Sequence, residues 1–412
     1  MLDDVQRDVE SIRLPRWGQV VAGEGVVPWL VLDPAGQAVE PIMRFLRDFV
    51  ARGNRATSVR SYAYALMRWW RFLRVVEVEW SRATSADVRD FALWLRYATK
   101  PGRRTTSAAT AGTINPVTRK KHLDNRYQVR TLRHSNAVLR TFYEYWIELG
   151  HPPLINPVPL DRRRGGRPGA HHNPMEPHQR DGKLRYNPKI PQRRPRAMPD
   201  ERWNELFSAM RSNRDRAILA LAISTAARAS ELLGVGPADL DWGDQLIRVR
   251  RKGTDAEQWL PASAEAFVWL RLYLAEVGDP PAGATIWMTL RRRGRGDHGE
   301  LARRPLNYDA MRAVLRRANA LLGSNWSMHD LRHTAGIRMV RDESLSMRDV
   351  QTILGHADLT TTQIYTEDDD DAVIRRVHQH LAERARASKQ APVVAEGYDP
   401  TTLAVLFGEV GR

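Results

Sequence analysis

The sequence predicts a mainly α-helical fold with a small antiparallel β-sheet, divided between two domains. Its 412 residues are too many for one compact hydrophobic core, which favours two or three domains. Apolar residues recur at the spacing of an α-helix along most of the chain, whereas the alternation typical of strands is clearest at residues 239–261. A basic, proline-rich segment at residues 156–195 has little apolar periodicity and separates two helical regions.

Residues 1–40 are expected to form an N-terminal extension. Two short apolar runs flank a Pro-Ala-Gly turn within residues 26–41, a pattern that is typical of a hairpin or an extended arm. Met1 leads into acidic and polar residues, so no secretion signal is expected.

Residues 41–155 predict a small helical domain that carries arginine and lysine on its outer faces. The first predicted helix, at residues 41–53, places four apolar side chains on one stripe. A second helix should bury Trp69 and Trp70, and a third should begin at the capping residue Thr84. One or two further helices are predicted in the last third of this domain.

The segment at residues 156–195 is expected to be an extended basic linker. Residues 160–196 contain eleven lysines and arginines against three acidic residues, together with six prolines. This composition is typical of a solvated tether and also of a strap along a phosphate backbone, and both roles remain open. Three histidines in this stretch lack the regular spacing of metal ligands, so no metal site is expected at His171, His172 or His178.

Residues 196–387 predict the second helical domain, which includes the small sheet. A capped helix is expected after Pro199, and residues 214–235 are apolar on all sides, which favours one buried helix. The alternation at residues 239–261 predicts the antiparallel sheet, and four helices are expected after it. Residues 388–412 are expected to form a C-terminal tail.

The charge of the chain favours a nucleic acid as its partner. Lysine and arginine outnumber aspartate and glutamate by 64 to 48, which gives a net charge of +16. The longest apolar run, Ala217–Ala227, is about half the length of a membrane span, so no membrane partner is expected. The chain has no cysteine, which excludes disulfides, thiol catalysis and cysteine-based zinc sites. We therefore expect a cytoplasmic protein that is associated with the nucleoid.

One short C-terminal window gathers the residue types that an attack on a phosphodiester requires. It contains His329, Arg332, His356 and Tyr365. The guanidinium and the imidazoles can stabilise developing negative charge, and the phenol oxygen can serve as the nucleophile. Because a phenol has a pKa of about 10, it also needs a strongly positive pocket or a nearby base to react at neutral pH.

Two further motifs complete a known pattern. Arg228 stands in TAARASELLGV, and Lys252 stands in RKGTDAEQWLP, 24 residues further on and within the predicted sheet. With the HDLRHT and LGH boxes and the tyrosine nine residues later, this order resembles the tyrosine recombinase (phage-type integrase) family. The resemblance covers residues 196–385. It departs from the family at Ala226–Ala227, where members often have glycine and an apolar residue, and we expect only a minor change in packing there.

The resemblance implies a nucleophile and a pair of phosphate-binding arginines. Tyr365 would attack the scissile phosphorus. Arg228 and Arg332 would bind its two non-bridging oxygens with the planar, bidentate geometry that lysine cannot reproduce. Glu231, one helical turn after Arg228, lies at a spacing that suits binding of that guanidinium.

The remaining members of the pattern handle protons. The resemblance implies that Lys252 protonates the 5′ oxygen as it leaves. It also implies that His329 and His356 donate hydrogen bonds to the phosphate, with His329 helping in acid–base chemistry. No metal, ATP or other cofactor is implied, because the phosphotyrosyl bond retains the energy for resealing.

The resemblance thus implies a site-specific recombinase or integrase that cleaves and rejoins DNA through a 3′-phosphotyrosyl intermediate, in the service of a mobile element. Residues 41–155 would be its helical core-binding DNA domain, 156–195 its linker and 196–387 its tyrosine-recombinase catalytic domain. The expected partners are double-stranded DNA and three further copies of the chain in a homotetramer on synapsed sites. Accessory DNA-bending factors would also be compatible, and the tail at residues 388–412 would dock on a neighbouring protomer or pack on its own.

Two other functions are compatible with the same residues. A type IB topoisomerase uses the same catalytic logic but relaxes supercoils with little sequence preference. A DNA-binding regulator that has lost cleavage would keep the fold without the chemistry, although the complete residue set argues against it. Trapping of a covalent adduct on a true site would separate the enzymes from the regulator.

Overall fold

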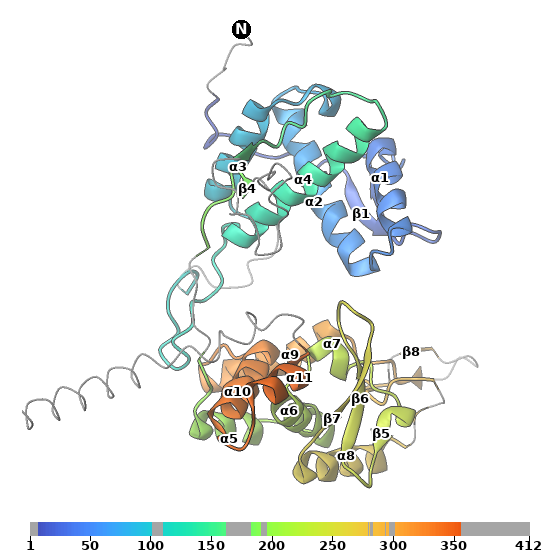
Figure 1. Cartoon of the computed structure of the whole chain (residues 1–412), viewed down its shortest axis with the longest axis vertical. Helices are drawn as coiled ribbons and strands as arrows, with labels where there is room; N and C mark the ends of the chain where they lie inside the picture. Colours follow the sequence, from blue (N-terminus) through green and yellow to red (C-terminus); the bar gives the residue numbers. More distant parts are fainter. Residues whose placement is uncertain are drawn as a thin grey trace, which may run out of the picture. The chain divides into compact units, whose positions relative to one another are not determined.

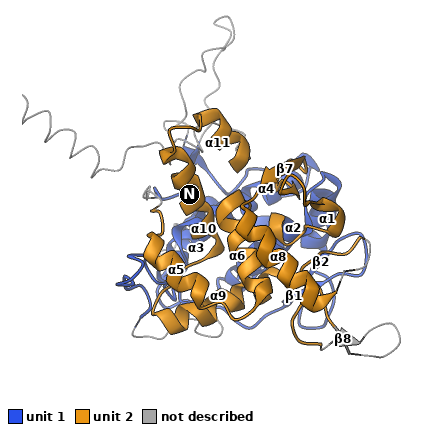
Figure 2. Cartoon of the chain, turned by 90° about the horizontal axis from the view of Figure 1, so that it is seen from below, with its two compact units in different colours: residues 1–192 blue, residues 193–412 orange. Residues whose placement is uncertain are grey.

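The computed structural model divides into two compact units, residues 1–192 and residues 193–412 (Figure 2). Both units are mainly helical and carry small antiparallel sheets, which confirms the predicted fold class. The structure describes residues 7–100, 110–161, 183–190, 196–278, 280, 283–292, 294–295 and 301–355.

The described part of the first unit is built around a long helix, α2, which packs against its neighbours α1, α3 and α4 (Figure 1). The helices are α1 Glu40–Ala51, α2 Ala56–Val75, α3 Ser85–Tyr97 and α4 Val129–Glu148, with a 3₁₀ turn η1 Trp80–Arg82. Two antiparallel pairs of short strands accompany them: β1 Gln19–Ala22 with β2 Trp29–Leu32, and β3 Leu160–Asp161 with β4 Lys183–Leu184.

The apolar stripe and the capping residue form the helices as predicted. All four stripe residues of α1 are buried, namely Ile42, Phe45, Leu46 and Phe49. Helix α3 begins with a capping box, in which the Asp87 carboxylate accepts hydrogen bonds from the main chain and hydroxyl of Thr84 at 2.8 Å each. Of the one or two helices expected in the last third of the domain, the described residues form one, α4.

Aromatic side chains fill the core of the first unit. Trp69 and Trp70 are buried, as expected, and Trp94 is buried with them. The indole of Trp69 donates to the hydroxyl of Tyr143 at 2.9 Å, and that hydroxyl donates to the Trp80 carbonyl at 2.9 Å. Burial also raises the pKa of the Tyr143 phenol, which therefore stays protonated and available as a donor. The hydrogen bonds satisfy polar groups that would otherwise be costly inside an apolar core.

The N-terminal residues belong to this core rather than lying apart from it. Ile12, Val27 and Val31 are buried with the helices. The hairpin pairs β1 with β2, so its turn lies at residues 23–28; the Pro-Ala-Gly turn instead connects β2 to α1. Arg71 of α2 donates to the carbonyls of residues 17 and 18 at 2.6 and 2.8 Å, which ties the N-terminal segment to the helices.

The described part of the second unit places a buried helix, α6, between α8 and α10 (Figure 1). Its helices are α5 Asp200–Ser208, α6 Asn213–Thr225, α7 Ala229–Leu232, α8 Ala264–Val277, α9 Tyr308–Leu322, α10 Met328–Arg341 and α11 Met347–Leu354, with a 3₁₀ turn η3 Pro237–Asp239. Its strands are β5 Leu240–Asp241, β6 Leu246–Arg250, β7 Glu257–Pro261, β8 Gly294–Arg295 and β9 Leu301–Ala302.

The predicted antiparallel sheet forms in the order β5-β6-β7. Its longer hairpin pairs Leu246 with Pro261 at one end and Arg250 with Glu257 at the other. The chain beyond Arg250 turns back through a short loop, closed by a hydrogen bond of 2.8 Å from the Arg251 N–H to the Ala256 carbonyl. Lys252 lies in this loop.

The prediction of one continuous buried helix at residues 214–235 was wrong. Helix α6 ends at Thr225, Ala226 adopts a left-handed conformation with φ of 53°, and α7 begins at Ala229. The Thr225 hydroxyl donates to the Leu221 carbonyl at 2.7 Å and accepts from the Ala227 N–H at 3.2 Å, which stabilises the break. Left-handed geometry favours glycine. The departure from the family's glycine at Ala226 therefore concerns backbone conformation and not only packing.

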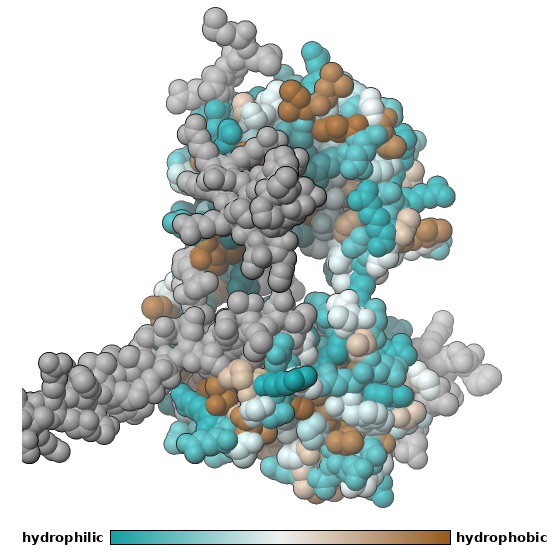
Figure 3. Space-filling view, in the orientation of Figure 1, coloured by the Kyte–Doolittle hydropathy of each residue, from teal (hydrophilic) through white to brown (hydrophobic). Residues whose placement is uncertain are grey.

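The face that Figure 3 shows is predominantly polar. On the face that Figure 3 shows, hydrophilic residues cover most of the described surface of each unit, with separate apolar patches. None of the helices in the described ranges combines the length and the apolar character that crossing a bilayer requires.

Candidate active site in the second unit

Arg228 lies where α6 and α7 meet, as the residue that precedes the first turn of α7. Its guanidinium donates from Nη1 to Oε1 of Glu231 at 2.7 Å, and its main-chain N–H donates to Oε2 of the same carboxylate at 2.8 Å. The break in the helix therefore turns the Arg228 side chain out of the apolar core, and Glu231 fixes its direction. The Arg228 side chain remains 30% exposed, so a ligand can still reach it.

Glu231 is the buried centre of the cluster. Besides Arg228, its carboxylate accepts hydrogen bonds from Nη1 of Arg251 at 3.2 Å and from the Lys252 N–H at 3.1 Å. Burial by itself would raise the pKa of Glu231, but the hydrogen bonds from Arg228 and Lys252 and the charge of Arg228 outweigh it, and the pKa lies below its ordinary value. Glu231 is thus ionised at neutral pH and binds cationic groups from two separate elements.

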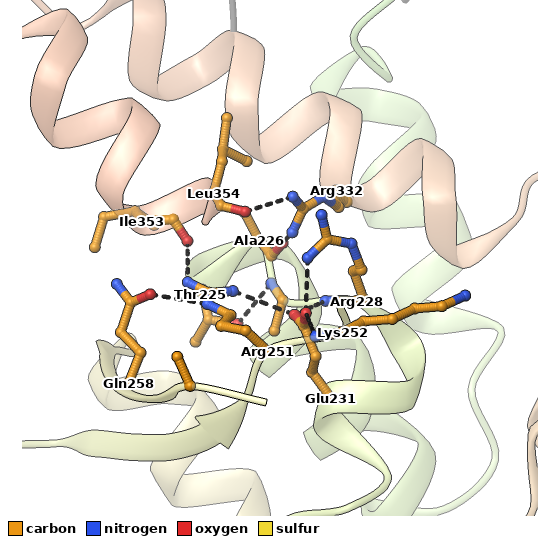
Figure 4. Close-up of polar contacts among 12 residues, drawn as sticks. Thr225, Ala226, Arg228, Glu231, Arg251, Lys252, Gln258, Arg332, Ile353 and Leu354 are labelled. Atoms are coloured by element: carbon orange, nitrogen blue, oxygen red, sulfur yellow. Dashed lines mark hydrogen bonds and ion pairs between the residues drawn. The ribbon is translucent and has the colours of Figure 1, made fainter. Parts of the chain in front are cut away.

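Lys252 enters the cluster through its main chain. Its N–H reaches Glu231, while its side chain is exposed. Figure 4 shows this side chain extending away from the Glu231 carboxylate. The loop that carries it includes Gly253 with φ of 115° and Asp255 with φ of 55°, both in the left-handed region. The main chain of Lys252 is therefore fixed by the cluster, whereas its ammonium group is exposed to solvent.

Arg332 approaches the same place from α10. It is 3% exposed and donates from Nη1 to the Ala226 carbonyl and from Nη2 to the Leu354 carbonyl, both at 2.6 Å. Because Ala226 is two residues before Arg228, the two arginines converge on one segment of backbone, as Figure 4 shows. These two contacts hold the Arg332 guanidinium beside the backbone that leads into Arg228.

The histidines and the tyrosine are placed unequally. His329 is exposed on α10, one turn before Arg332, and its ring contacts that of His333 with 4.1 Å between centroids. His356 and Tyr365 lie outside the described residues, as do His171, His172 and His178. Of the six candidates, the structure gathers Arg228, Lys252 and Arg332 and sets His329 on the same helix as Arg332.

Two residues of the cluster were not anticipated from the sequence. Arg251 is 4% exposed and donates from Nε to Oε1 of Gln258 at 2.8 Å and from Nη2 to the Ile353 carbonyl at 2.5 Å. Gln258 in turn donates to the Thr352 carbonyl at 2.9 Å. A signal was available: Ile247 and Val249 face the core, and the alternation along β6 puts Arg251 on the same side. A buried arginine requires acceptors, which here are Glu231, Gln258 and the end of α11.

The cluster is suited to binding an anion. Arg228 and Arg251 bind the Glu231 carboxylate, Arg332 binds the adjoining backbone, and Lys252 follows Arg251 directly, so positive side chains outnumber the carboxylate in this cluster. Two guanidinium groups beside the turn between α6 and α7 can bind a tetrahedral phosphate in a bidentate manner. Within the described ranges, no group of three or more histidine, aspartate or glutamate side chains is arranged to hold a metal ion.

The first unit carries a separate basic groove. A cavity of 1020 Å³ lies between the N-terminal segment, α2 and the end of α3, and we call it the basic groove. Its exposed cations are Arg13, Arg16, Lys100 and Arg126. Its lining also includes exposed tyrosines at positions 64 and 97, and one acidic residue, Glu10. Cations interleaved with aromatic rings are typical of nucleic-acid contact.

Known proteins are similar to this chain in sequence and in fold. A model described as the phage integrase family matches residues 196–372. The tyrosine recombinase XerC of Azotobacter vinelandii is 29% identical over 307 residues, which cover 71% of this chain and 85% of that protein. Transposase A from transposon Tn554 of Staphylococcus aureus is 24% identical over 345 residues, which cover 81% of this chain and 88% of the transposase.

Two solved structures resemble the chain in fold at low sequence identity. The Tn1549 transposon integrase in complex with circular intermediate DNA has a TM-score of 0.52 at 14% identity, covering 82% of this chain and 98% of that one. A lambda integrase dimer bound to a core site also has a TM-score of 0.52 at 14% identity, covering 80% and 95% respectively.

The fold is similar to that of solved integrases, and the second unit gathers arginines around one buried carboxylate. Residues 196–372 match the phage integrase family, and the chain is a tyrosine-type site-specific recombinase.

Proposed function

We propose that this recombinase cleaves and rejoins duplex DNA for a mobile element, with Tyr365 as the nucleophile of a 3′-phosphotyrosyl intermediate. The observation that carries the proposal is the cluster around Glu231. It fixes the partly exposed Arg228 side chain and the start of the Lys252 loop, and Arg332 donates to the backbone two residues before Arg228. These are the donors that a pentavalent phosphate needs.

The chemistry follows from the residue types. The phenolic oxygen of Tyr365 attacks phosphorus and passes its proton to His329 as the base, while Arg228 and Arg332 stabilise the charge on the non-bridging oxygens. The bond from phosphorus to the 5′ oxygen breaks, and the Lys252 ammonium donates a proton to that oxygen. His329 and His356 add hydrogen bonds to the phosphate. The free 5′ hydroxyl of a second duplex then attacks the phosphotyrosyl bond and releases the tyrosine.

The domain roles are proposed to follow the same division. Residues 41–155 form the core-binding DNA domain, and the N-terminal residues 1–40 complete its basic groove. Residues 156–195 serve as the basic linker, and residues 196–387 catalyse. The Tn1549 integrase was solved with DNA and the lambda integrase as a dimer on a DNA site, which supports duplex DNA as the partner here.

The assembly is proposed to be a homotetramer on two synapsed sites, with accessory DNA-bending factors as further partners. A mobile element is favoured because relatives include a transposase from Tn554 and an integrase from Tn1549. The tetramer can be checked by cross-linking the protein in the presence and absence of its site DNA, with four linked copies expected only with DNA.

The decisive experiment uses DNA that flanks the gene and carries a nicked suicide site. We expect a covalent protein–DNA adduct with the parent protein and none with Tyr365→Phe, which should still bind. Binding without an adduct in the parent would indicate a regulator instead. Relaxation of supercoiled plasmids that lack any recombination site would indicate an activity of the type IB topoisomerase kind.

A further inference from the structure

We propose that Arg251 is a positioning residue for Lys252, because it joins the loop that carries Lys252 to the end of α11. The inference rests on the proposed role of Lys252 as the acid that protonates the leaving 5′ oxygen. It adds a residue that the motif pattern does not contain. Arg251 itself does not touch the phosphate in this proposal; it acts through the loop that begins directly after it.

The contacts of Arg251 run in three directions. Nη1 donates to the buried Glu231 at 3.2 Å, Nε to Gln258 across the hairpin at 2.8 Å, and Nη2 to the Ile353 carbonyl at 2.5 Å. Gln258 donates to the Thr352 carbonyl at 2.9 Å and so repeats the link to α11. The hairpin is thereby joined to the carboxylate that binds Arg228 and to the last turn of α11.

The loop needs such a restraint because its own conformation is weakly determined. The strand ladder ends with the pair Arg250 and Glu257. The four residues at the tip, Lys252 to Asp255, are exposed and include glycine, which gives a loop with few packing contacts. The side chain of Arg251 is the last buried one before that tip. Its loss should widen the range of positions that the Lys252 ammonium occupies.

The environment of Arg251 suits an arginine and not a lysine. The carbonyls of residues 352 to 354 form the negative end of α11, where a cation is favoured. A guanidinium can serve Glu231, Gln258 and a carbonyl at once through its planar fork, whereas an ammonium has no such fixed geometry. Arg251 is also packed closely against the residue that follows α11, because a Cβ added at Gly355 would lie only 2.8 Å from Nε of Arg251.

The test compares two DNA substrates that differ in the leaving atom. One carries the natural 5′ oxygen at the scissile bond, and the other carries sulfur there. A thiol has a pKa of about 8.5, so the thiolate leaves without a proton and cleavage no longer depends on Lys252. We expect Arg251→Ala to cleave the oxygen substrate about 100-fold more slowly than the parent, the scale of a misplaced catalytic group. On the sulfur substrate it should cleave at nearly the parental rate.

The matched control is Arg250→Ala, which removes the same charge one residue earlier from a side chain that is 79% exposed. It should cleave both substrates at nearly the parental rate. If Arg251→Ala fails to fold, Gln258→Ala can replace it, because this change removes the hydrogen bonds of Gln258 to Arg251 and to the Thr352 carbonyl. It should likewise cleave the oxygen substrate slowly and the sulfur substrate at nearly the parental rate. Arg251→Lys keeps the charge and should still be slow on oxygen and recover on sulfur.

Three outcomes would overturn the inference. Arg251→Ala could match Arg250→Ala on the oxygen substrate, which would show that the contacts do not matter for cleavage. It could be equally slow on both substrates, which would indicate damage to the phosphate-binding arginines. Arg251→Lys could also cleave the oxygen substrate at the parental rate, which would show that a positive charge alone is sufficient to position Lys252. An inactive parent protein would instead contradict the proposed function.

Discussion

The main-chain N–H of Lys252 donates a hydrogen bond of 3.1 Å to Oε1 of Glu231. The same oxygen accepts the Arg228 guanidinium at 2.7 Å. One atom of a buried carboxylate therefore sets the positions of a helix start and of a hairpin loop. The residues proposed to bind the phosphate and to protonate the leaving oxygen are linked through it, and they should respond together when it is changed.

Glu231→Gln should lower the free energy of unfolding by about 2 kcal/mol at neutral pH, because charge-assisted hydrogen bonds are lost. Since the pKa of Glu231 lies below its ordinary value of 4.5, the ionised group stabilises the fold above that pH. This contribution is lost as the pH falls through the lowered pKa. Denaturant titrations from pH 7 to pH 3 should show a flatter acid limb for Glu231→Gln than for the parent. The exposed control Glu201→Gln should keep the parental slope.

Arg228→Lys should reduce the rate of covalent adduct formation by about 100- to 1000-fold, the cost of removing one donor to a developing oxyanion. A lysine keeps the charge but loses the fork that binds Glu231 and the phosphate together. The affinity for site DNA should change little, because most of the binding free energy comes from contacts along the phosphate backbone of the DNA. Adduct formation and gel-shift binding measure the two effects, with Arg202→Lys on the exposed face of α5 as the control. An unchanged adduct rate would remove Arg228 from the proposed site.

Lys252→Ala should slow cleavage of a natural 5′-oxygen substrate by about 100- to 10,000-fold, the usual contribution of a general acid. Cleavage of the matching 5′-sulfur substrate should be close to that of the parent, because a thiolate leaves unprotonated. Single-turnover rates on both substrates provide the measurement. Tyr365→Phe should remain inactive on both, since sulfur cannot replace a nucleophile. Equal losses of Lys252→Ala on the two substrates would contradict a role as the acid.

Tyr143→Phe should destabilise the first unit by about 1–3 kcal/mol, the cost of leaving buried polar groups without partners. The change removes the acceptor of the Trp69 indole and the donor to the Trp80 carbonyl. Thermal melting of the full chain, followed by tryptophan fluorescence, should show an earlier transition for this unit. Tyr64→Phe, at an exposed position of the same unit, should melt like the parent. Equal melting of both variants would mean that the buried hydrogen bonds contribute little.

Reversing two charges in the basic groove should weaken DNA binding and its dependence on salt. With Arg16→Glu and Arg126→Glu together, the slope of log affinity against log salt should fall by about two, one for each lost phosphate contact. Arg47→Glu on α1 with Arg52→Glu at the residue that follows α1 changes the charge equally outside the groove lining and serves as the control. Binding isotherms at several salt concentrations give the slopes. Equal slopes for the two double variants would place the DNA on another face.

Much of the fold could be predicted because it is recorded in local periodicity. The stripes of α1 and α2, the Thr84 cap and the alternation of β6 and β7 each depend on residues that are near neighbours in the sequence. Burial then follows from the apolar face. The residue types of the site could also be predicted, because a guanidinium, an ammonium, an imidazole and a phenol each have a characteristic reactivity.

The sequence by itself thus determined the helical class and the aromatic core, and it predicted six candidate residues for the site. Only the tertiary structure decided where α6 breaks and what Arg251 binds. An apolar run reads as a continuous helix, but the left-handed turn at Ala226 depends on Thr225, Glu231 and the Arg332 contact acting together. Arg251 meets acceptors 20 and 102 positions away. Periodicity reports which face of an element is buried, whereas the packing of separate elements selects the partner that a buried charge meets there.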